Sequence, residues 1–363
     1  MLEDLQGCEP LKALTFEGAR RLAWHDVPGP VIADGRQAVV RPIASTTCDL
    51  DQRIIAGRSP FEPPFAIGHE CVAEVVDIGS SVRSVKPGDV VVVPWHFFCG
   101  ECDRCRAGVT ASCEAVGRYA CFGIPIGGHW GGLFSDLALV PFADAMLVPV
   151  PEGVDPAAAV SVSDNLTDAW IGVSKGLARH LGAKVLVHGG VGSLGMYAVQ
   201  LALAAGAESV DYVDLDASRR TMAKSLGAIV HEVVDPNLFW RFPIVINATR
   251  DVAEMRLAIQ CLSPGGHLSG LAIFFQDTPM PLWELYVRDA TFSAGIPSVR
   301  PHIPRVLEML RCGHVHPERV TSRIIQWDDA AEALAEPSLK PVVVRPALFT
   351  PAGSQHRREG SVI

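Results

Sequence analysis

Four cysteines lie close together in the first third of the chain, at Cys99, Cys102, Cys105 and Cys113, in the pattern C-x2-C-x2-C-x7-C. Zinc takes four thiolates tetrahedrally in closed structural sites, and two-residue gaps allow one tight loop to turn its sulfurs toward one centre. Related spacings hold iron–sulfur clusters, and a disulfide framework is the third alternative. The pattern favours a metal that stabilises the loop over residues 97–115 and leaves no coordination position open for a reaction.

A glycine-rich turn stands between an apolar strand and a helix near the middle of the chain. Gly190, Gly192 and Gly195 fit G-x-G-x-x-G, and Ser193 and Leu194 complete the turn. Glycines at these positions permit a tight turn and let the backbone approach a pyrophosphate at the N-terminus of the following helix. These five residues are therefore predicted to bind a dinucleotide.

An acidic residue follows the next predicted strand, at a position that selects between two dinucleotides. Asp214 stands 19 residues after Gly195. A carboxylate there accepts hydrogen bonds from the adenosine ribose and repels a 2′-phosphate, which favours NAD. Asp211 and Asp216 are alternative residues for this role, and the cation Arg219 leaves NADP possible.

The segments that must position these residues differ along the chain. Residues 1–155 contain short alternating or apolar runs separated by turn residues, which is typical of a β-rich, barrel-like unit. Residues 156–295 alternate apolar strands with helical stretches, which predicts an α/β unit with a doubly wound parallel sheet. Residues 296–350 add two amphipathic helices and a closing strand, and the polar tail 351–363 is expected to be mobile. The expected strands are 37–42, 71–78, 90–94, 184–188, 209–213, 243–248, 266–272 and 341–345, and the expected helices are 192–205, 217–226, 252–262, 304–312 and 327–335.

Composition narrows the class of protein. The chain has 363 residues, 48% of them hydrophobic, and 31 Lys and Arg against 40 Asp and Glu give a net charge of −9. This size and composition allow two domains with substantial cores, and the acidic balance argues against nucleic acid as the main partner. No apolar run approaches the roughly 20 residues of a membrane-spanning helix, and the acidic start MLEDLQGCEPLK lacks a hydrophobic signal core. We expect a cytoplasmic protein that binds neither a membrane nor nucleic acid.

Three further residues could form a second metal centre if the fold brings them together. Cys48, His69 and Asp164 each have an ordinary structural interpretation, as a packed thiol, a core histidine and a helix N-cap. Together, a thiolate, an imidazole and a carboxylate make an open three-ligand zinc set, and zinc beside a dinucleotide is a known catalytic combination.

Several motifs in a fixed order carry a resemblance to a known family. They are Gly68-His69-Glu70 followed by Val75–Gly79, the turn Lys86–Val91, the four-cysteine loop and the glycine turn 190–195. From about residue 12 to residue 346 the chain resembles the zinc-dependent medium-chain dehydrogenase/reductase family, in its alcohol dehydrogenase-like group. The resemblance implies a GroES-like catalytic domain over 1–155 and 296–350 and a Rossmann-type dinucleotide-binding domain over 156–295. It also implies two zinc ions per chain, one catalytic and one structural.

The same resemblance assigns the catalytic zinc to Cys48 of a C-x-x-D segment, His69 of the Gly-His-Glu segment, and Asp164. The aspartate resembles the third ligand of glutathione-independent formaldehyde dehydrogenase-like members. Glu70 is, by resemblance, a close neighbour of the zinc that can exchange onto it. Zinc in such a site acts as a Lewis acid on the substrate oxygen while hydride passes to or from the nicotinamide.

Two positions depart from the family pattern where most members relay a proton. Leu50 stands where most members have a serine or threonine, and Arg53 stands where many have a histidine. Leucine neither donates nor accepts a proton. Asp168, four residues after Asp164, stands where a hydroxyl residue usually touches the nicotinamide. A water chain or Asp168 could replace the relay, or the enzyme could reduce conjugated double bonds, as some relatives without the relay do.

The substrate pocket is expected, by resemblance, to be lined by Leu50, Trp95 and His96, which favours a largely apolar small molecule. The leading hypothesis is an NAD(P)-linked, two-zinc oxidoreductase acting on an alcohol/aldehyde or ketone pair. The alternatives are a conjugate (1,4) reductase of an enal or unsaturated imine, a formaldehyde dehydrogenase or dismutase with tightly held NAD, and a zinc-stabilised nucleotide-binding protein without turnover. Relatives are homodimers or homotetramers, which implies a homo-oligomer here.

Overall fold

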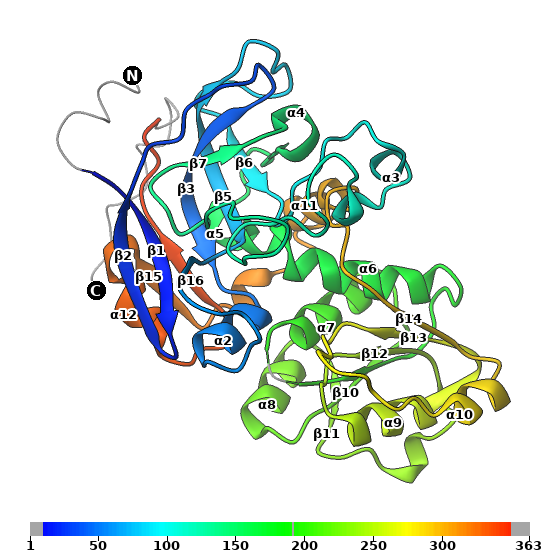
Figure 1. Cartoon of the computed structure of the whole chain (residues 1–363). Helices are drawn as coiled ribbons and strands as arrows, with labels where there is room; N and C mark the ends of the chain where they lie inside the picture. The colour runs from blue at the N-terminus through cyan, green and yellow to red at the C-terminus, as the bar shows by residue number, and fades with distance from the viewer. Residues whose placement is uncertain (1–9, 191, 350–363) are drawn as a thin grey trace, which may run out of the picture.

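Parallel strands form the central sheet of the second half of the chain (Figure 1). The computed structural model describes residues 10–190 and 192–349, so the predicted mobile tail lies outside the described residues. Six strands lie in the order β11-β10-β9-β12-β13-β14, and every neighbouring pair is parallel. Their bounds are β9 Val185–His188, β10 Val210–Val213, β11 Ile229–His231, β12 Phe242–Asn247, β13 Leu262–Gly270 and β14 Thr291–Ala294.

Helices cover both faces of this sheet (Figure 1). α6, α7 and α8 lie on one face, and α9 and α10 lie on the other. Because both faces are covered, β9 and β10 are buried along their whole length, and β9 carries the apolar run Val185–Val187. This confirms the predicted doubly wound parallel sheet. The helices are α6 Asn165–Leu177, α7 Leu194–Ala204, α8 Ala217–Ser225, α9 Val252–Cys261 and α10 Leu282–Val287.

The first part of the chain is rich in strands, and strands from the C-terminal part join it. A larger sheet has the order β15-β16-β3-β5-β6-β8, with β7 paired to β3, and a smaller sheet has the order β2-β1-β4. The strands are β1 Leu11–Gly18, β2 Arg21–Val27, β3 Ala38–Thr46, β4 Phe65–Ala66, β5 Glu70–Ile78, β6 Val90–Val93, β7 Ala138–Val140, β8 Val148–Pro149, β15 Arg323–Gln326 and β16 Pro341–Val344. The helices of this part are α2 Asp49–Ile55, α3 Asp103–Arg106, α4 Ala143–Met146, α5 Pro156–Ala159, α11 Ile303–Arg311 and α12 Ala330–Ala335. The β-rich unit is as predicted, and the residue boundaries of the two domains stay a prediction.

Element ends differ from the sequence expectations where a local conformation intervenes. β3 continues to Thr46 beyond the expected end at Pro42, because an irregularity between Pro42 and Ala44 takes up the proline without ending the strand. α7 begins at Leu194 and not at Gly192, because Gly192 has φ +128°, outside the helical range. Among the described residues, no helix is both long enough and apolar enough to cross a membrane.

α6 lies where the two units meet, since it contacts β12 and β13 of the parallel sheet and also α11 (Figure 1). Two glycines of α6 allow it to approach the sheet closely. A Cβ added at Gly172 would lie 2.8 Å from the Leu271 side chain, and one added at Gly176 would lie 2.6 Å from the Ile244 side chain. The helix therefore packs on the sheet through a surface that has no room for larger side chains.

We predict that Gly176→Val lowers the free energy of unfolding by about 1–3 kcal/mol, because the added methyl groups overpack the contact with Ile244. Lys175→Val places the same β-branched residue on the exposed side of the same helix and serves as the control. Urea unfolding of both variants measures the difference. Equal stabilities for the two variants would contradict the close approach of α6.

Candidate metal and dinucleotide sites

The four-cysteine loop brings its ligands together as predicted. The sulfurs of Cys99, Cys102, Cys105 and Cys113 lie within 4.8 Å of one another, and all four residues are free cysteines. Hydrogen bonds from the backbone N–H groups of Glu114 and Cys105 lower the pKa of the Cys102 thiol to about 6. Four sulfurs at this spacing, one of them readily deprotonated, fit a tetrahedral zinc ion.

This loop also supports a wall of the neighbouring cavity. The backbone N–H of Ala111 donates to Ser298 Oγ at 3.1 Å. Ser298 follows Ile296 and Pro297, which line the cavity beside Cys48. The four-cysteine loop is thus placed to hold that wall in position.

The ends of two paired strands bring Cys48 and His69 together. β3 and β5 are antiparallel, with Thr46 opposite Glu70, so the residues just after β3 lie beside the residue just before β5. Cys48 is the N-cap of α2, and its sulfur accepts from the backbone N–H of Leu50 at 3.2 Å. Cys48 and His69 are both buried, and both line one cavity.

Asp51 lies behind His69, a neighbour that the sequence analysis missed. Its Oδ2 accepts from the backbone N–H of Cys48 at 3.0 Å, and its Oδ1 lies 3.5 Å from His69 Nδ1. Cys48, Asp51 and His69 have ligand atoms within 4.8 Å of one another. Asp51 is fully buried and does not line the cavity, so its carboxylate is placed to orient the imidazole. The sequence does contain a signal for this neighbour of His69, because Asp51 is the aspartate of the C-x-x-D segment that begins at Cys48.

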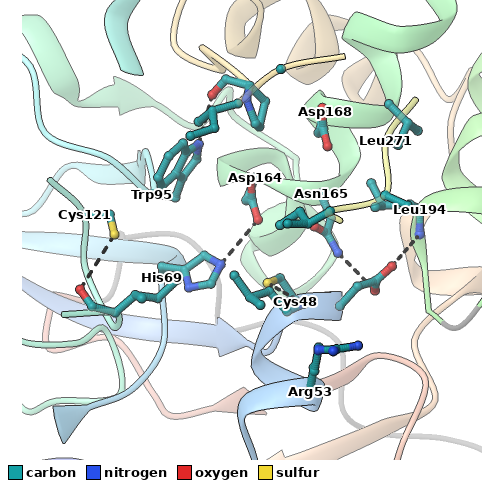
Figure 2. Close-up of a pocket in the computed structure, with 18 of the residues that line it drawn as sticks. Cys48, Arg53, His69, Trp95, Cys121, Asp164, Asn165, Asp168, Leu194 and Leu271 are labelled. Carbon is teal, nitrogen blue, oxygen red and sulfur yellow. Dashed lines mark hydrogen bonds and ion pairs between the residues drawn. The ribbon is translucent and has the colours of Figure 1, made fainter. Parts of the chain in front are cut away.

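Asp164 approaches the other side of the same imidazole. Its Oδ2 lies 3.4 Å from His69 Nε2, and Figure 2 shows the two side chains pointing toward each other. Ser163 fixes the preceding turn, because its Oγ accepts from the backbone N–H of Cys71 at 3.0 Å. The three predicted ligands therefore lie around one end of one cavity, with Asp164 on the open side and Asp51 behind.

The chemistry of this donor set fits a zinc ion. Burial raises the pKa of the Cys48 thiol to about 12, so the sulfur stays protonated at neutral pH unless a cation compensates its charge. Burial lowers the pKa of His69, but the charge of Asp51 and the hydrogen bond with Asp164 outweigh it and raise that pKa well above its usual value. A buried thiol and imidazole, with the Asp164 carboxylate 3.4 Å from that imidazole, are the ligand types of a catalytic zinc site. The ligand atoms that all lie within 4.8 Å of one another belong to Cys48, Asp51 and His69, and this group does not include Asp164.

Glu70 makes two strong contacts away from this cluster. It forms an ion pair with Lys340 Nζ, and its Oε1 accepts from the backbone N–H of Asn165 at 2.7 Å. Lys340 Nζ also donates to the carbonyl oxygen of Thr47 at 3.1 Å. Burial raises the pKa of Glu70 to about 7, against the opposing charge of Lys340. Exchange of Glu70 onto zinc stays a prediction, and Lys340 is a partner that the sequence analysis did not identify.

The glycine turn lies at the carboxyl ends of β9 and β12, where the direction of strand order reverses. Ligands of such sheets bind at that point. A Cβ added at Gly190 would lie 2.3 Å from the carbonyl oxygen of Ala248, so only glycine fits beside the end of β12. Ser193 and Leu194 present their backbone N–H groups at the start of α7. This cradle, together with the acid after β10, fits a dinucleotide.

Asp214 lies beneath this turn but is already paired. A Cβ added at Gly189 would lie 2.5 Å from Asp214 Oδ2. The carboxylate accepts from Tyr212 Oη at 2.7 Å and from Arg219 Nε and Nη2 at 2.7 and 2.8 Å. The guanidinium neutralises the carboxylate charge on which the predicted preference for NAD depends.

A second cavity of about 530 Å³ lies beside Gly192 and Arg219. Five guanidinium groups line it, and two of the five, together with Asp49, also line the cavity at Cys48. The five are Arg20, Arg53, Arg58, Arg219 and Arg250.

The cavity at the metal cluster has a volume of about 370 Å³ and mainly apolar walls. Leu50 and Trp95 line it as expected. His96 does not: it is fully buried, and its Nε2 lies 2.8 Å from Thr110 Oγ1. The family resemblance placed both Trp95 and His96 in the pocket, but these neighbouring side chains point to different sides, and His96 faces Thr110.

Asp168 lines this cavity one helical turn after Asp164, and it also lines a smaller cavity that contains Lys175 and His302. Burial, together with the charge of Asp164, raises the pKa of Asp168 well above its usual value. Asp168 is therefore a side chain that can carry a proton where Leu50 cannot.

We predict that Cys102→Ser removes one of two zinc ions per chain and lowers the Tm by about 5 °C or more, since the loop loses its metal cross-link. Elemental analysis and calorimetry measure both effects. Cys312→Ser, at an exposed free cysteine, is the control and should change neither. Iron with visible absorbance in the wild type would point instead to an iron–sulfur cluster, and unchanged zinc in C102S would contradict the site.

Known proteins resemble this chain along most of its length. The family "Alcohol dehydrogenase GroES-like domain" matches residues 34–152, and the family "Zinc-binding dehydrogenase" matches residues 193–311. An L-threonine 3-dehydrogenase of Streptomyces coelicolor is 30% identical over 301 residues, covering 79% of this chain and 84% of that protein. A probable zinc-binding alcohol dehydrogenase of Mycobacterium tuberculosis is 27% identical over 335 residues, covering 90% of this chain and 85% of that protein. The solved alcohol dehydrogenase TADH from Thermus sp. ATN1 superposes with a TM-score of 0.83 at 30% identity, covering 92% of this chain and 99% of that one.

These matches confirm the predicted fold class and the oxidoreductase class, and they confirm at the level of the family that zinc is a cofactor. With two family matches, a relative at 30% identity and a shared two-unit fold, the chain belongs to the zinc-dependent medium-chain dehydrogenase/reductase family, in its alcohol dehydrogenase-like group.

Proposed function

We propose that the chain transfers hydride between a nicotinamide dinucleotide and an alcohol/aldehyde or ketone pair at the cluster of Cys48, His69 and Asp164. One observation carries the proposal: these side chains lie at one end of a cavity that Leu194, from the glycine turn, also lines. A substrate oxygen at the cluster is therefore close to a dinucleotide on α7. Zinc, when bound, would polarise that oxygen, and the nicotinamide would supply or accept the hydride.

The residues of the chain would act around these groups in separate roles. Cys48, His69 and Asp164 would hold the metal, and Asp51 would keep His69 Nε2 directed at it. Leu50, Trp95 and Leu271 would enclose a largely apolar substrate and exclude water.

The choice of dinucleotide rests on two opposing features. Asp214 favours NAD, as the sequence indicates. Arg219, which pairs with Asp214, and the four other arginines of the neighbouring cavity provide positive charge for a 2′-phosphate and therefore favour NADP. We propose that the chain accepts NADP as well as NAD, so both cofactors belong in every assay.

A homo-oligomer stays part of the proposal. β14 is an edge strand of the described parallel sheet, and α10 presents Leu282, Trp283 and Tyr286 with exposed fractions of 69%, 70% and 78%. A free edge beside exposed apolar side chains is typical of a subunit contact. A cytoplasmic location also remains a prediction.

We predict that Cys48→Ser lowers kcat/KM for hydride transfer by about 10³-fold or more, because it weakens the metal site that polarises the substrate. The zinc content should fall from two ions per chain toward one. Cys121→Ser, at a free cysteine lining the same cavity outside the ligand group, is the matched control and should keep both zinc ions and most of the activity.

The assay uses a panel of alcohols, aldehydes, ketones and enals with NADH and NADPH, and scores the products for 1,2- against 1,4-reduction. Saturated product from an enal would establish the conjugate reductase, the second candidate, which Leu50 in the cavity wall favours. Unchanged hydride transfer by C48S would contradict the catalytic metal site. No turnover of any compound would favour a nucleotide-binding protein without catalysis.

We also predict that Asp168→Asn lowers kcat for carbonyl reduction by about 10²- to 10⁴-fold, because an amide cannot supply the proton that a carboxylic acid can. Dissociation constants for the cofactor should stay unchanged, and Asp168→Glu should restore part of the rate. Comparing rates in H₂O and D₂O tests the assignment: the solvent isotope effect should differ between wild type and D168N. Equal rates and equal isotope effects would place the proton route elsewhere.

A further inference from the structure

A carboxylate of this chain lies where a cofactor pyrophosphate would bind. Asp49, the residue after Cys48, accepts through Oδ1 from the backbone N–H of Ser193 at 2.8 Å and from Ser193 Oγ at 3.0 Å. Asn165 Nδ2 lies 3.2 Å from the same oxygen, and the backbone N–H of Leu194 lies 3.4 Å from Oδ2. Dashed lines in Figure 2 mark contacts of Asn165 and Leu194 with this carboxylate. The N–H groups at the start of α7 are thus directed at an anion that the chain itself provides.

The glycine turn is shaped around this carboxylate. Gly192 has φ +128°, and a Cβ added there would lie 2.1 Å from the carboxyl carbon and Oδ2 of Asp49. Asp49 therefore lies in the hollow that the missing side chain leaves. In glycine turns of this kind the hollow and the following N–H groups receive the pyrophosphate. Two anions cannot occupy the same donors at once.

The contact also joins the two units of the molecule. Asp49 begins α2 beside the large β-rich sheet, and Ser193 and Leu194 begin α7 beside the parallel sheet (Figure 1). Arg53, one turn along α2, and Arg250, after β12, line the two cavities that Asp49 also lines. A carboxylate displaced from α7 therefore has cationic side chains within the same cleft.

We propose that Asp49 is an internal competitor of the cofactor. Without a dinucleotide its carboxylate caps α7 and ties the two units together, and it must leave the N–H groups of Ser193 and Leu194 before a pyrophosphate binds. This inference rests on the proposed dinucleotide site. It implies that the chain binds its cofactor more weakly than it would with a neutral side chain at position 49.

The test compares wild type with Asp49→Asn and Asp49→Ala by calorimetric titration with NADH, NADPH, ADP-ribose and adenosine. We expect both variants to bind the two dinucleotides and ADP-ribose about tenfold more tightly, because the competing charge is gone. Adenosine has no pyrophosphate, so its affinity should not change. Glu152→Gln makes the same change in net charge at an exposed position between β8 and α5 and should leave every affinity at the wild-type value.

A second readout separates competition from a general loss of structure. Without cofactor, Asp49→Asn should lower the Tm by about 2–4 °C, because α7 loses a charged cap. Saturating NADH should remove the difference, and the zinc content should equal that of wild type. Asn at position 49 keeps the shape of the side chain, so this variant tests the charge even if Asp49→Ala folds poorly.

Two results would overturn the proposal in different ways. If wild type binds NADH but D49N binds NADH and ADP-ribose no more tightly, Asp49 does not compete, and the proposed function stands. If neither wild type nor D49N binds any dinucleotide, the proposed function fails, and the inference fails with it.

Discussion

The antiparallel register of β3 and β5 is the constraint on which the metal cluster depends. With Thr46 opposite Glu70, the chain leaving β3 and the chain entering β5 meet at the same end of this strand pair. Cys48 and His69 lie there. The hydrogen bond from the backbone N–H of Cys71 to Ser163 Oγ brings the start of α6 to the same place. A slip of one residue in this register would turn His69 to the opposite face of the sheet and separate it from Cys48.

Buried charged side chains around the metal cluster also fix the positions of its residues. Asp51 and His69 face each other within the protein, and Glu70 is paired with Lys340 behind the cluster. A buried ionisable group is costly unless it has a partner, so each of these side chains fixes the position of another. The Lys340–Glu70 pair also connects the last strand region, near β16, to the start of β5. The C-terminal part of the chain is in this way part of the site.

The proposed dinucleotide site differs because it lies between the two units, where a carboxylate of one unit contacts the other. Asp49 reaches from α2 to the first N–H groups of α7, and Arg219 neutralises Asp214 below the turn. Arginines from both units line the adjoining cavity. The cleft therefore combines cations that attract a polyphosphate with one carboxylate that opposes it, and the balance between them sets the affinity for the cofactor.

Features that depend on neighbouring residues were predictable from the sequence. The four-cysteine loop, the glycine turn and the alternation of strands and helices are set by spacing along the chain, because a short loop or a regular element allows few geometries. The three-ligand set of Cys48, His69 and Asp164 came from a family resemblance, and the structure places the three around one cavity. Element ends were less accurate where a proline irregularity or a positive φ intervened, as at Pro42 and Gly192.

Contacts between distant segments could not be predicted in this way. Only the folded chain shows that Asp51 lies behind His69, that His96 faces Thr110 and not the cavity, and that Lys340 pairs with Glu70. The capture of the α7 N-terminus by Asp49 belongs to the same group. The sequence by itself determined which local motifs form, since spacing controls geometry over a few residues. Tertiary structure decided which side chains meet, because strand register and the packing of the two units set distances between residues far apart in the chain.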